Sequence, residues 1–195
     1  MSSTISFWVA RYYPKLGDVV VDVGAGCGED LHAWSKLVGP DGRVFAIEAD
    51  PMQYSMLLLA CERNVVPIHC AAVDKPQVVW IEPDPATPQS STLSMVPGVG
   101  HPCVGLPLDM LLVDVPSIAL LKMNIEGAET LALPGAVQTL RKTQHVVIAA
   151  HDFRADRGEG EQFRTHAFVM LALASHGFKQ IETIPGWYHV HARKG

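Results

Sequence analysis

The side chains best placed to do chemistry in this 195-residue chain follow apolar runs that predict buried strands. The first such run, residues 18–23, leads into a turn in which Gly24 and Gly26 let a ligand approach the backbone closely. A helix is expected over residues 29–38, and its first turn would offer free backbone N–H groups to a carboxylate or phosphate. This arrangement predicts a site for a nucleotide or nucleoside.

The glycine spacing bears on which ligand binds. Dinucleotide-binding enzymes favour Gly-x-Gly-x-x-Gly, but Glu29 occupies the third glycine position here, and the glycine falls one residue earlier at Gly28. An acid at Glu29 would repel a diphosphate, whereas Asp22, two residues before the turn, suits a cationic ligand that carries an amine. We therefore expect S-adenosylmethionine, and an NAD-dependent oxidoreductase remains the alternative. The expected cofactor contacts in this turn are Asp22, Gly24, Ala25 and Gly26.

Two further acids are candidate nucleoside contacts. Glu48 ends the second expected strand, about twenty residues after the glycines, where an acidic side chain binds ribose hydroxyls. Ala49 is expected beside it, and Asp74, after the third strand, is a candidate partner for adenine. The simpler interpretations are that Asp22 caps the turn, that Asp50 caps a helix starting at Pro51, and that Asp74 is a turn residue.

Candidate catalytic residues follow the fourth and fifth expected strands. Asn124 and Glu126 lie at the end of residues 119–125, and His151 directly follows residues 145–150. Ligands bind at the carboxyl ends of strands in open α/β sheets, so these side chains are expected near the glycine turn. Glu126 could orient a substrate or take its proton, and His151 titrates in the range of a base. Alternatively, Glu126 only opens the next helix and His151 is an ordinary loop histidine.

Positioning these residues requires an alternation of strands and helices, and the hydrophobic pattern predicts it. The pattern predicts one α/β domain over residues 1–195: a doubly wound, mostly parallel, seven-stranded sheet with helices on both faces and an antiparallel last strand. Residues 82–107 are expected to form an irregular loop over the site, and residues 152–161 a charged loop. The expected strands are 18–23, 43–48, 65–73, 119–125, 145–150, 179–183 and 188–192, with an extra strand at 78–81. The expected helices are 4–13, 29–38, 51–62, 108–112, 128–141 (interrupted at Pro134 and Gly135) and 163–176.

Composition excludes several other classes of protein. The net charge is −5 and no Lys/Arg run occurs, which argues against a nucleic-acid-binding chain. The four cysteines fit no zinc motif, and a His189-x-His191 pair without a nearby acid is a weak metal signal, so no metal is expected. The longest apolar run, residues 167–174, is too short to cross a bilayer, and no signal peptide is recognisable. We expect a cytoplasmic protein that binds no membrane; the sequence does not predict its oligomeric state.

A longer motif carries a resemblance. Residues 121–129 read LKMNIEGAE and are followed by LPGA at 133–136, with LPLD at 106–109 and His151 after the fifth strand. The chain resembles the FkbM family of S-adenosylmethionine-dependent methyltransferases over residues 19–177; the family pattern in the first segment is Lys-x-Asp-x-Glu-Gly-x-Glu. The resemblance implies a Rossmann-like class I methyltransferase fold and O-methylation of a hydroxyl on a small molecule or sugar. It also implies catalytic roles for Glu126, His151 and Asn124, with Asn124 contacting the cofactor.

The chain departs from the family pattern at two places. Asn124 replaces the usual aspartate and so removes a carboxylate from the site, and residues 148–150 read IAA where the family strand commonly carries a glutamate. An amide can donate and accept hydrogen bonds but is not a useful base. A module that binds the cofactor without transferring a methyl group is therefore a further alternative.

Overall fold

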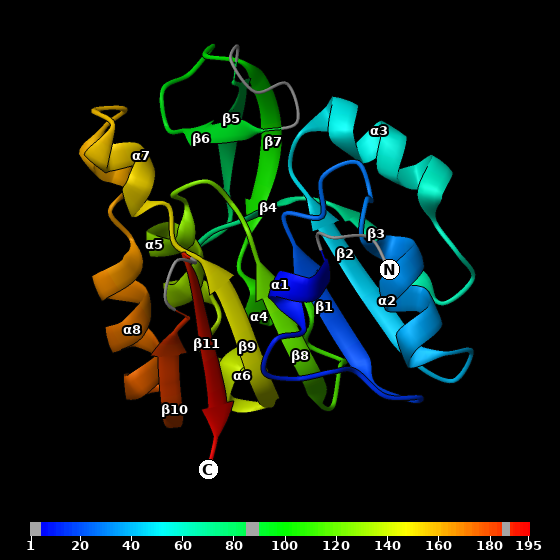
Figure 1. Cartoon of the computed structure of the whole chain (residues 1–195). Coiled ribbons are helices and arrows are strands. Elements are labelled where there is room, and N and C mark those ends of the chain that lie inside the picture. Colours follow the sequence, from blue (N-terminus) through cyan, green and yellow to red (C-terminus); the bar gives the residue numbers. More distant parts are fainter. Residues whose placement is uncertain (1–4, 85–89, 185–187) are drawn as a thin grey trace.

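The computed structural model describes residues 5–84, 90–184 and 188–195, and its centre is a twisted seven-stranded sheet (Figure 1). The strand order is β10-β11-β9-β8-β1-β2-β3. Strands β3, β2, β1, β8 and β9 run parallel, whereas β11 is antiparallel to both β9 and β10. The predicted doubly wound, mostly parallel sheet is confirmed. Its strands are β1 (Val19–Val23), β2 (Arg43–Glu48), β3 (Val65–His69), β8 (Ile118–Met123), β9 (Thr143–Ala149), β10 (Phe178–Thr183) and β11 (His189–Lys194).

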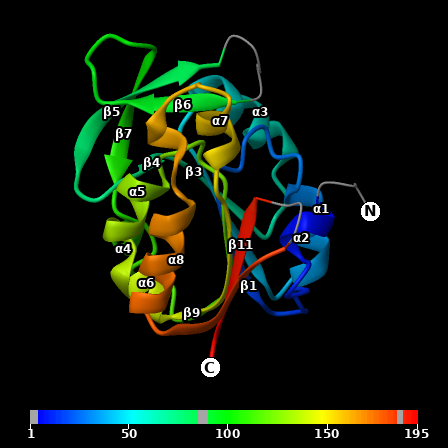
Figure 2. The same ribbon diagram turned by 60° about the vertical axis from the view of Figure 1, so that its left-hand side comes forward.

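Two helical layers cover the sheet because successive strand residues point to opposite faces. Val20 packs with α1 (Ile5–Trp8), α2 (Leu31–Val38) and α3 (Pro51–Ala60) on one face. Val21 packs on the other face, against α4 (Leu108–Leu111), α5 (Glu129–Ala132), α6 (Val137–Arg141) and α8 (His166–Ser175) (Figure 2). The central strands β1 and β8 are thus buried on both sides, as their near-continuous apolar sequences predict.

Several helix boundaries follow from local chemistry. Asp50 caps α3, since its Oδ1 accepts hydrogen bonds from the backbone N–H groups of Met52 (2.8 Å) and Gln53 (3.0 Å). The expected interruption between α5 and α6 is the 3₁₀ turn Leu133–Gly135. Gly135 is needed there because a Cβ atom would lie 2.2 Å from the carbonyl oxygen of Val73. None of the helices within the described ranges is long and apolar enough to cross a membrane.

A second sheet corrects the expectation for residues 82–107. Its order is β4-β7-β5-β6, formed by β4 (Ala71–Ala72), β5 (Gln77–Pro83), β6 (Ser91–Ser94) and β7 (His101–Leu106). Val79 and Ile81 of β5 and Cys103 of β7 are buried together with Ala71 and Val73, so the segment has a small core of its own. The expected single strand over residues 65–73 therefore ends at His69, and its continuation joins the second sheet, which stands over the carboxyl ends of the main strands (Figure 1).

Two shorter elements also differ from expectation. The opening helix covers only Ile5–Trp8 rather than extending to residue 13, and Thr4 lies outside the described residues. The charged segment 152–161 begins with a short helix, α7 (Asp152–Asp156). The carboxylate of Asp152, at the start of α7, accepts hydrogen bonds from the backbone N–H groups of Thr165 (3.0 Å) and His166 (2.9 Å). It thereby ties α7 to the start of α8.

Candidate active site

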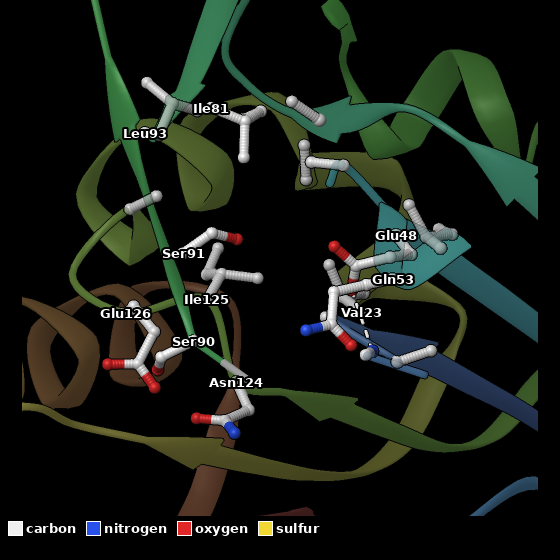
Figure 3. Close-up of a pocket in the computed structure, with 18 of the residues that line it drawn as sticks. Val23, Glu48, Gln53, Ile81, Ser90, Ser91, Leu93, Asn124, Ile125 and Glu126 are labelled. Atoms are coloured by element: carbon white, nitrogen blue, oxygen red, sulfur yellow. Dashed lines mark hydrogen bonds between the residues drawn. The ribbon is translucent and has the colours of Figure 1, made fainter. Parts of the chain in front are cut away.

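A pocket opens at the carboxyl ends of β1, β2 and β8, beneath the second sheet (Figure 3). Glu48 and Gln53 line one side of it, and Glu126, Ser90 and Asn124 line the other. The β5–β6 part of the second sheet and the glycine turn also line the pocket. Of the residues expected in the site, the structure brings together Gly24, Ala25, Gly26, Glu48, Ala49, Asn124 and Glu126. Asp22, Asp74 and His151 do not line it.

The glycine turn is held rigidly at one end of the pocket. Gly24 has a φ of +76° and lies so close to β8 that a Cβ atom would sit 2.0 Å from the carbonyl oxygen of Asn124. The N–H groups of Gly24 and Ala25 both donate to the carbonyl oxygen of Ile47, at 2.9 and 3.1 Å. A Cβ atom at Gly26, by contrast, would meet nothing within 4 Å. The backbone at Gly26 is therefore open to a ligand, as the sequence predicts.

Glu48 is buried and oriented by the backbone. Its Oε2 accepts the N–H of Gly26 (2.7 Å) and its Oε1 accepts the N–H of Asp50 (2.8 Å); the first of these bonds is the dashed line in Figure 3. Burial raises the pKa of Glu48, against the lowering effect of those N–H donors. A carboxylate has about four lone-pair positions, and the N–H groups of Gly26, Asp50 and Ala49 use three of them, so one remains for a hydroxyl donor in the pocket.

Asp22 is placed differently from the expectation that it faces a cationic ligand. Its Oδ1 lies 2.7 Å from the Nζ of Lys122, and its Oδ2 accepts the indole N–H of Trp34 at 3.0 Å. Lys122 also donates to the carbonyl oxygen of Gly24 at 2.7 Å. Asp22 is 1% exposed and its charge is already neutralised, so it supports the turn from below.

Sequence reasoning missed Lys122, although one signal was available. That signal is the single lysine in an otherwise apolar strand. Because fully buried lysines occur almost only with a partner, it predicts a buried anionic or polar partner for Lys122. It also missed Asp30, a residue that lines the pocket and whose carboxylate accepts the indole N–H of Trp8 at 2.9 Å. At the start of a helix, Asp30 looks like an ordinary acid that complements the helix dipole, so the sequence carried no signal for it.

Glu126, His151 and Glu129 form a carboxylate–imidazole–carboxylate series that leads away from the pocket. The Nε2 of His151 lies 3.3 Å from Oε1 of Glu126, and its Nδ1 lies 3.4 Å from Oε1 of Glu129. The second separation is long for a hydrogen bond, so that contact is an ion pair. His151 is 3% exposed and Glu129 is fully buried. Of the three, only Glu126 reaches the pocket.

The charges in this series oppose the expected role of His151 as a base. Burial by itself would lower the pKa of His151, but the two carboxylates outweigh it and raise the pKa to about 9. Burial would raise the pKa of Glu126, but contacts with His151, Arg154 and Ser90 outweigh it and lower the pKa to about 2. At neutral pH, His151 is therefore a buried imidazolium and Glu126 an ionised carboxylate.

Arg154 connects the pocket to the second sheet, and sequence reasoning did not identify it. Its guanidinium donates to Glu126 Oε2 (2.8 Å), to Asp84 Oδ2 (2.8 Å) and to Glu159 Oε2 (2.6 Å). Asp84 directly follows β5, whereas Glu126 follows β8. Arg154 therefore joins the end of β5 in the second sheet to the residue that follows β8 in the main sheet.

Glu126 itself is held in an unusual conformation. Its φ is +52°, and among the described residues it is the single non-glycine residue with a positive φ. Gly127 follows with a φ of +96°, and a Cβ atom there would lie 3.0 Å from the ring of Phe163. Strain of this kind persists where surrounding contacts fix it and is common at functional sites. The Glu-Gly pair of the motif thus turns the Glu126 carboxylate toward Ser90 and the pocket (Figure 3).

The remaining predicted residues lie elsewhere. Asp74 is exposed and accepts a hydrogen bond from Gln77 Nε2 at 3.1 Å, in the turn before β5. His189 stacks on Phe7 and lies edge-on to Trp8. Burial lowers the pKa of His189 and of His191 to about 4, so both are neutral. Within the described ranges, no three His, Cys, Asp or Glu side chains are grouped as a metal site.

The doubly wound sheet with its antiparallel strand β11 between β10 and β9, the glycine turn after β1 and the acid at the end of β2 define the class I methyltransferase fold. A sequence model of the methyltransferase FkbM domain matches residues 22–179. The chain belongs to this family of S-adenosylmethionine-dependent methyltransferases.

Solved structures agree on the fold. The chain is similar to the methyltransferase FkbM of Methylobacillus flagellatus KT, with a TM-score of 0.60 and 19% identity over 90% of this chain and 43% of that one. It is also similar to Aeropyrum pernix fibrillarin with natively bound S-adenosyl-L-methionine (TM-score 0.57, 14% identity, 97% of this chain and 74% of that one). A third neighbour is an S-adenosylmethionine-dependent methyltransferase from Aquifex aeolicus (0.56, 16%, 98% and 93%). The chain spans less than half of the Methylobacillus protein, and no curated protein matched it in sequence.

Proposed function

We propose that this chain binds S-adenosylmethionine in the pocket at the glycine turn and transfers its methyl group to a hydroxyl of a small molecule or sugar. One observation carries the proposal. A single pocket joins the turn at Gly24 and Gly26 and the carboxylate of Glu48 to a second polar wall formed by Asn124, Ser90 and Glu126. One polar wall can thus contact a cofactor and the other an acceptor.

The residues on the first wall fit the cofactor. Glu48 keeps an acceptor position for a ribose hydroxyl, and the backbone at Gly26 has open space beside it. Apolar side chains that include Ile47, Ile81 and Leu93 line the same pocket and suit a flat base. When bound, S-adenosylmethionine would supply a methyl group activated by a positively charged sulfur.

Glu126 is the residue best placed to receive the acceptor. Three of the roughly four lone-pair positions of its carboxylate are used by His151, Arg154 and Ser90, which leaves one for an acceptor hydroxyl. Glu126 would orient that oxygen toward the methyl carbon, and positioning supplies much of the rate in a reaction of this type.

The low pKa of Glu126 is compatible with this role. As the oxygen–methyl bond forms and the sulfur–methyl bond breaks, the acceptor becomes a protonated ether, which is a far stronger acid than any carboxylic acid. Glu126 could therefore take the proton at that stage and release it to water. His151 would stay protonated throughout and would position Glu126 rather than act as a base.

Calorimetry with S-adenosylmethionine tests the binding half of the proposal. We expect binding by the natural sequence and a strong loss for Glu48→Ala, whereas Asp74→Ala, outside the pocket, should bind normally. Absence of binding by the natural sequence would reject the proposal. An NAD-dependent oxidoreductase would instead bind NADH, and a fluorescence titration distinguishes the two.

The catalytic half needs an acceptor. Incubating the protein and methyl-labelled cofactor with a metabolite extract, and then tracing the label, would reveal one. The replacement of the family's aspartate by Asn124 and the absence of an unpaired base beside Glu126 in the described part of the pocket favour one second candidate, a module that binds the cofactor silently. That candidate predicts cofactor binding with no labelled product from any extract.

A further inference from the structure

The pocket is lined by several acids and by one base that the protein itself already uses. The acids are Glu29, Asp30, Glu48 and Glu126. Among the residues that line the described pocket, Lys122 is the single lysine, arginine or histidine. Its Nζ lies 2.7 Å from both the Oδ1 of Asp22 and the carbonyl oxygen of Gly24, and the residue is 3% exposed. Lys122 is therefore not available to pair with an anionic ligand.

Arg154 approaches the pocket from outside, and its charge is used as well. Its guanidinium donates to the carboxylates of Glu126, Asp84 and Glu159, and Arg154 does not line the pocket. Residues 1–4, 85–89 and 185–187, outside the described ranges, contain no lysine, arginine or histidine. Phosphate and carboxylate ligands are usually held by an arginine fork or a lysine. No such group is on offer in the described pocket.

The acceptor wall is negative and otherwise uncharged. Contacts with His151 and Arg154 hold the pKa of Glu126 at about 2, so Glu126 is ionised at neutral pH. The other polar side chains on this side of the pocket are hydroxyls and one amide: Ser90, Ser91, Thr92 and Asn124 (Figure 3). They can hydrogen-bond a hydroxyl group but cannot offset a negative charge. A phosphate or carboxylate beside Glu126 would meet a like charge, and such juxtapositions reject the wrong partner.

We propose that the methyl acceptor carries no anionic group, and that Glu126 is the residue that excludes phosphate and carboxylate compounds. This inference rests on the proposed function, methyl transfer to a hydroxyl in this pocket. The class that fits is a free polyol or an amino alcohol rather than a sugar phosphate or a hydroxy acid.

The charge that develops during transfer agrees with this class. The acceptor oxygen bonds the methyl carbon while the sulfur–methyl bond breaks and leaves its electron pair on sulfur. The hydroxyl proton then passes to Glu126 and on to water. Positive charge appears on the acceptor oxygen before the proton leaves, and a fixed carboxylate beside that oxygen stabilises it. The same carboxylate therefore favours a hydroxyl and opposes an anion.

The labelled product from a metabolite extract tests the acceptor class when it is separated by charge. The product is passed over an anion exchanger at pH 7, and an incubation without protein corrects for unreacted cofactor. We expect the label in the unretained fraction. A carboxylate acceptor would lose its charge on methylation, so this fraction is then treated with mild alkali. Alkali releases methanol from an ester and leaves an ether intact, and we expect no release.

The possible outcomes separate this inference from the proposed function. Label that is retained and stable to alkali would overturn the inference, whereas methyl transfer to a hydroxyl would stand. Label released by alkali would overturn both, because the acceptor oxygen would then be a carboxylate. Cofactor binding without any labelled product would also overturn both and would favour the silent module.

Two matched variants test the part assigned to Glu126. Glu126→Gln and Glu159→Gln each remove one carboxylate from Arg154, but only Glu126 lines the pocket. Glu126→Gln should act more slowly, because its proton acceptor is lost, and the retained share of its label should rise roughly tenfold. Glu159→Gln should match the natural sequence. Equal retained shares in all three proteins would overturn the role of Glu126, and the natural sequence alone decides the acceptor class.

Discussion

The Nζ of Lys122 on β8 lies 2.7 Å from the Oδ1 of Asp22 on β1, and the two residues are 3% and 1% exposed. The pair lies directly below the glycine turn, because Lys122 also donates a hydrogen bond to the carbonyl oxygen of Gly24. Two adjacent strands are therefore locked together at the point where the sheet must present its ligand. Removing one charge from a buried pair leaves the other without compensation.

We accordingly predict that Lys122→Met lowers the free energy of unfolding by about 3–5 kcal/mol. The double variant Asp22→Asn with Lys122→Met should recover part of that loss, since no unpaired charge remains. Urea unfolding of both variants measures the coupling. Arg11→Met breaks the exposed ion pair with Glu182 and serves as the control, with a much smaller loss expected. A Lys122 variant as stable as the Arg11 variant would contradict the structural role of the pair.

The close approach of Gly24 to β8 gives a second prediction. Gly24→Ala would place a Cβ atom 2.0 Å from the Asn124 carbonyl oxygen, at a φ of +76°. We expect a stability loss of about 2–4 kcal/mol from strain and overpacking, together with loss of cofactor binding. Gly98→Ala has a similar φ of +82° but open space around the new atom, so it isolates the backbone strain. That control should cost about 1 kcal/mol and leave cofactor binding intact. Equal costs in thermal unfolding would show that Gly24 is not packed as described.

The centre of the main sheet could be predicted from sequence because its strands, such as β1 and β8, are short apolar runs that must be buried on both faces. Residues 18–23 and 43–48 are examples, and both form strands within a residue of the predicted bounds. The glycine turn and Glu48 could be predicted because each is placed by its neighbours in the sequence: the turn directly follows a predicted strand, and Glu48 ends the next one. Both line the pocket.

The second sheet could not be predicted in the same way. Of its strands, only the expected extra strand at 78–81 was predicted, and it forms part of β5. Strands β6 and β7 lie in a segment rich in Ser, Pro and Gly, and β4 pairs with β7 across more than thirty residues of sequence. What stabilises them is pairing and a small shared core around Val79 and Cys103, which no local pattern contains. The roles of Asp22 and Asp30 were hidden likewise, because the residues that decide them, Lys122 and Trp8, are far away in the chain.

His151 provides a prediction about pH. Its pKa is raised to about 9 in the folded protein, above the value of about 6.5 expected when it is unfolded. The charged imidazole therefore adds stability that is fully present below pH 6.5 and is lost as the pH rises through 9. From this shift, we expect a loss on the order of 3 kcal/mol across that window.

The comparison with His151→Gln isolates this effect, because the variant cannot titrate there. Its unfolding free energy should change less between pH 6.5 and 9 than that of the natural sequence, as followed by urea unfolding at each pH. An NMR titration of the imidazole reports the pKa itself. A midpoint near or below 6.5 would refute the buried imidazolium and would restore His151 as a candidate base.

The last prediction concerns Arg154, the one cation shared by Asp84, Glu126 and Glu159. Arg154→Lys keeps the charge but cannot reach three carboxylates in different directions, because an ammonium group lacks the planar fork of a guanidinium. The end of β5 should then separate from the main sheet more often, and hydrogen exchange at β5 and β6 should become roughly tenfold faster.

Arg164→Lys is the matched control, since Arg164 joins Asp156 and Glu161 on the exposed side of the same region. It should leave exchange at β5 and β6 unchanged. Cofactor binding should survive in both variants, because neither arginine lines the cofactor wall of the pocket. If Arg154→Lys alters exchange in α7 and α8 alone, then Asp84 does not depend on this contact, and the second sheet is held over the pocket by its own core instead.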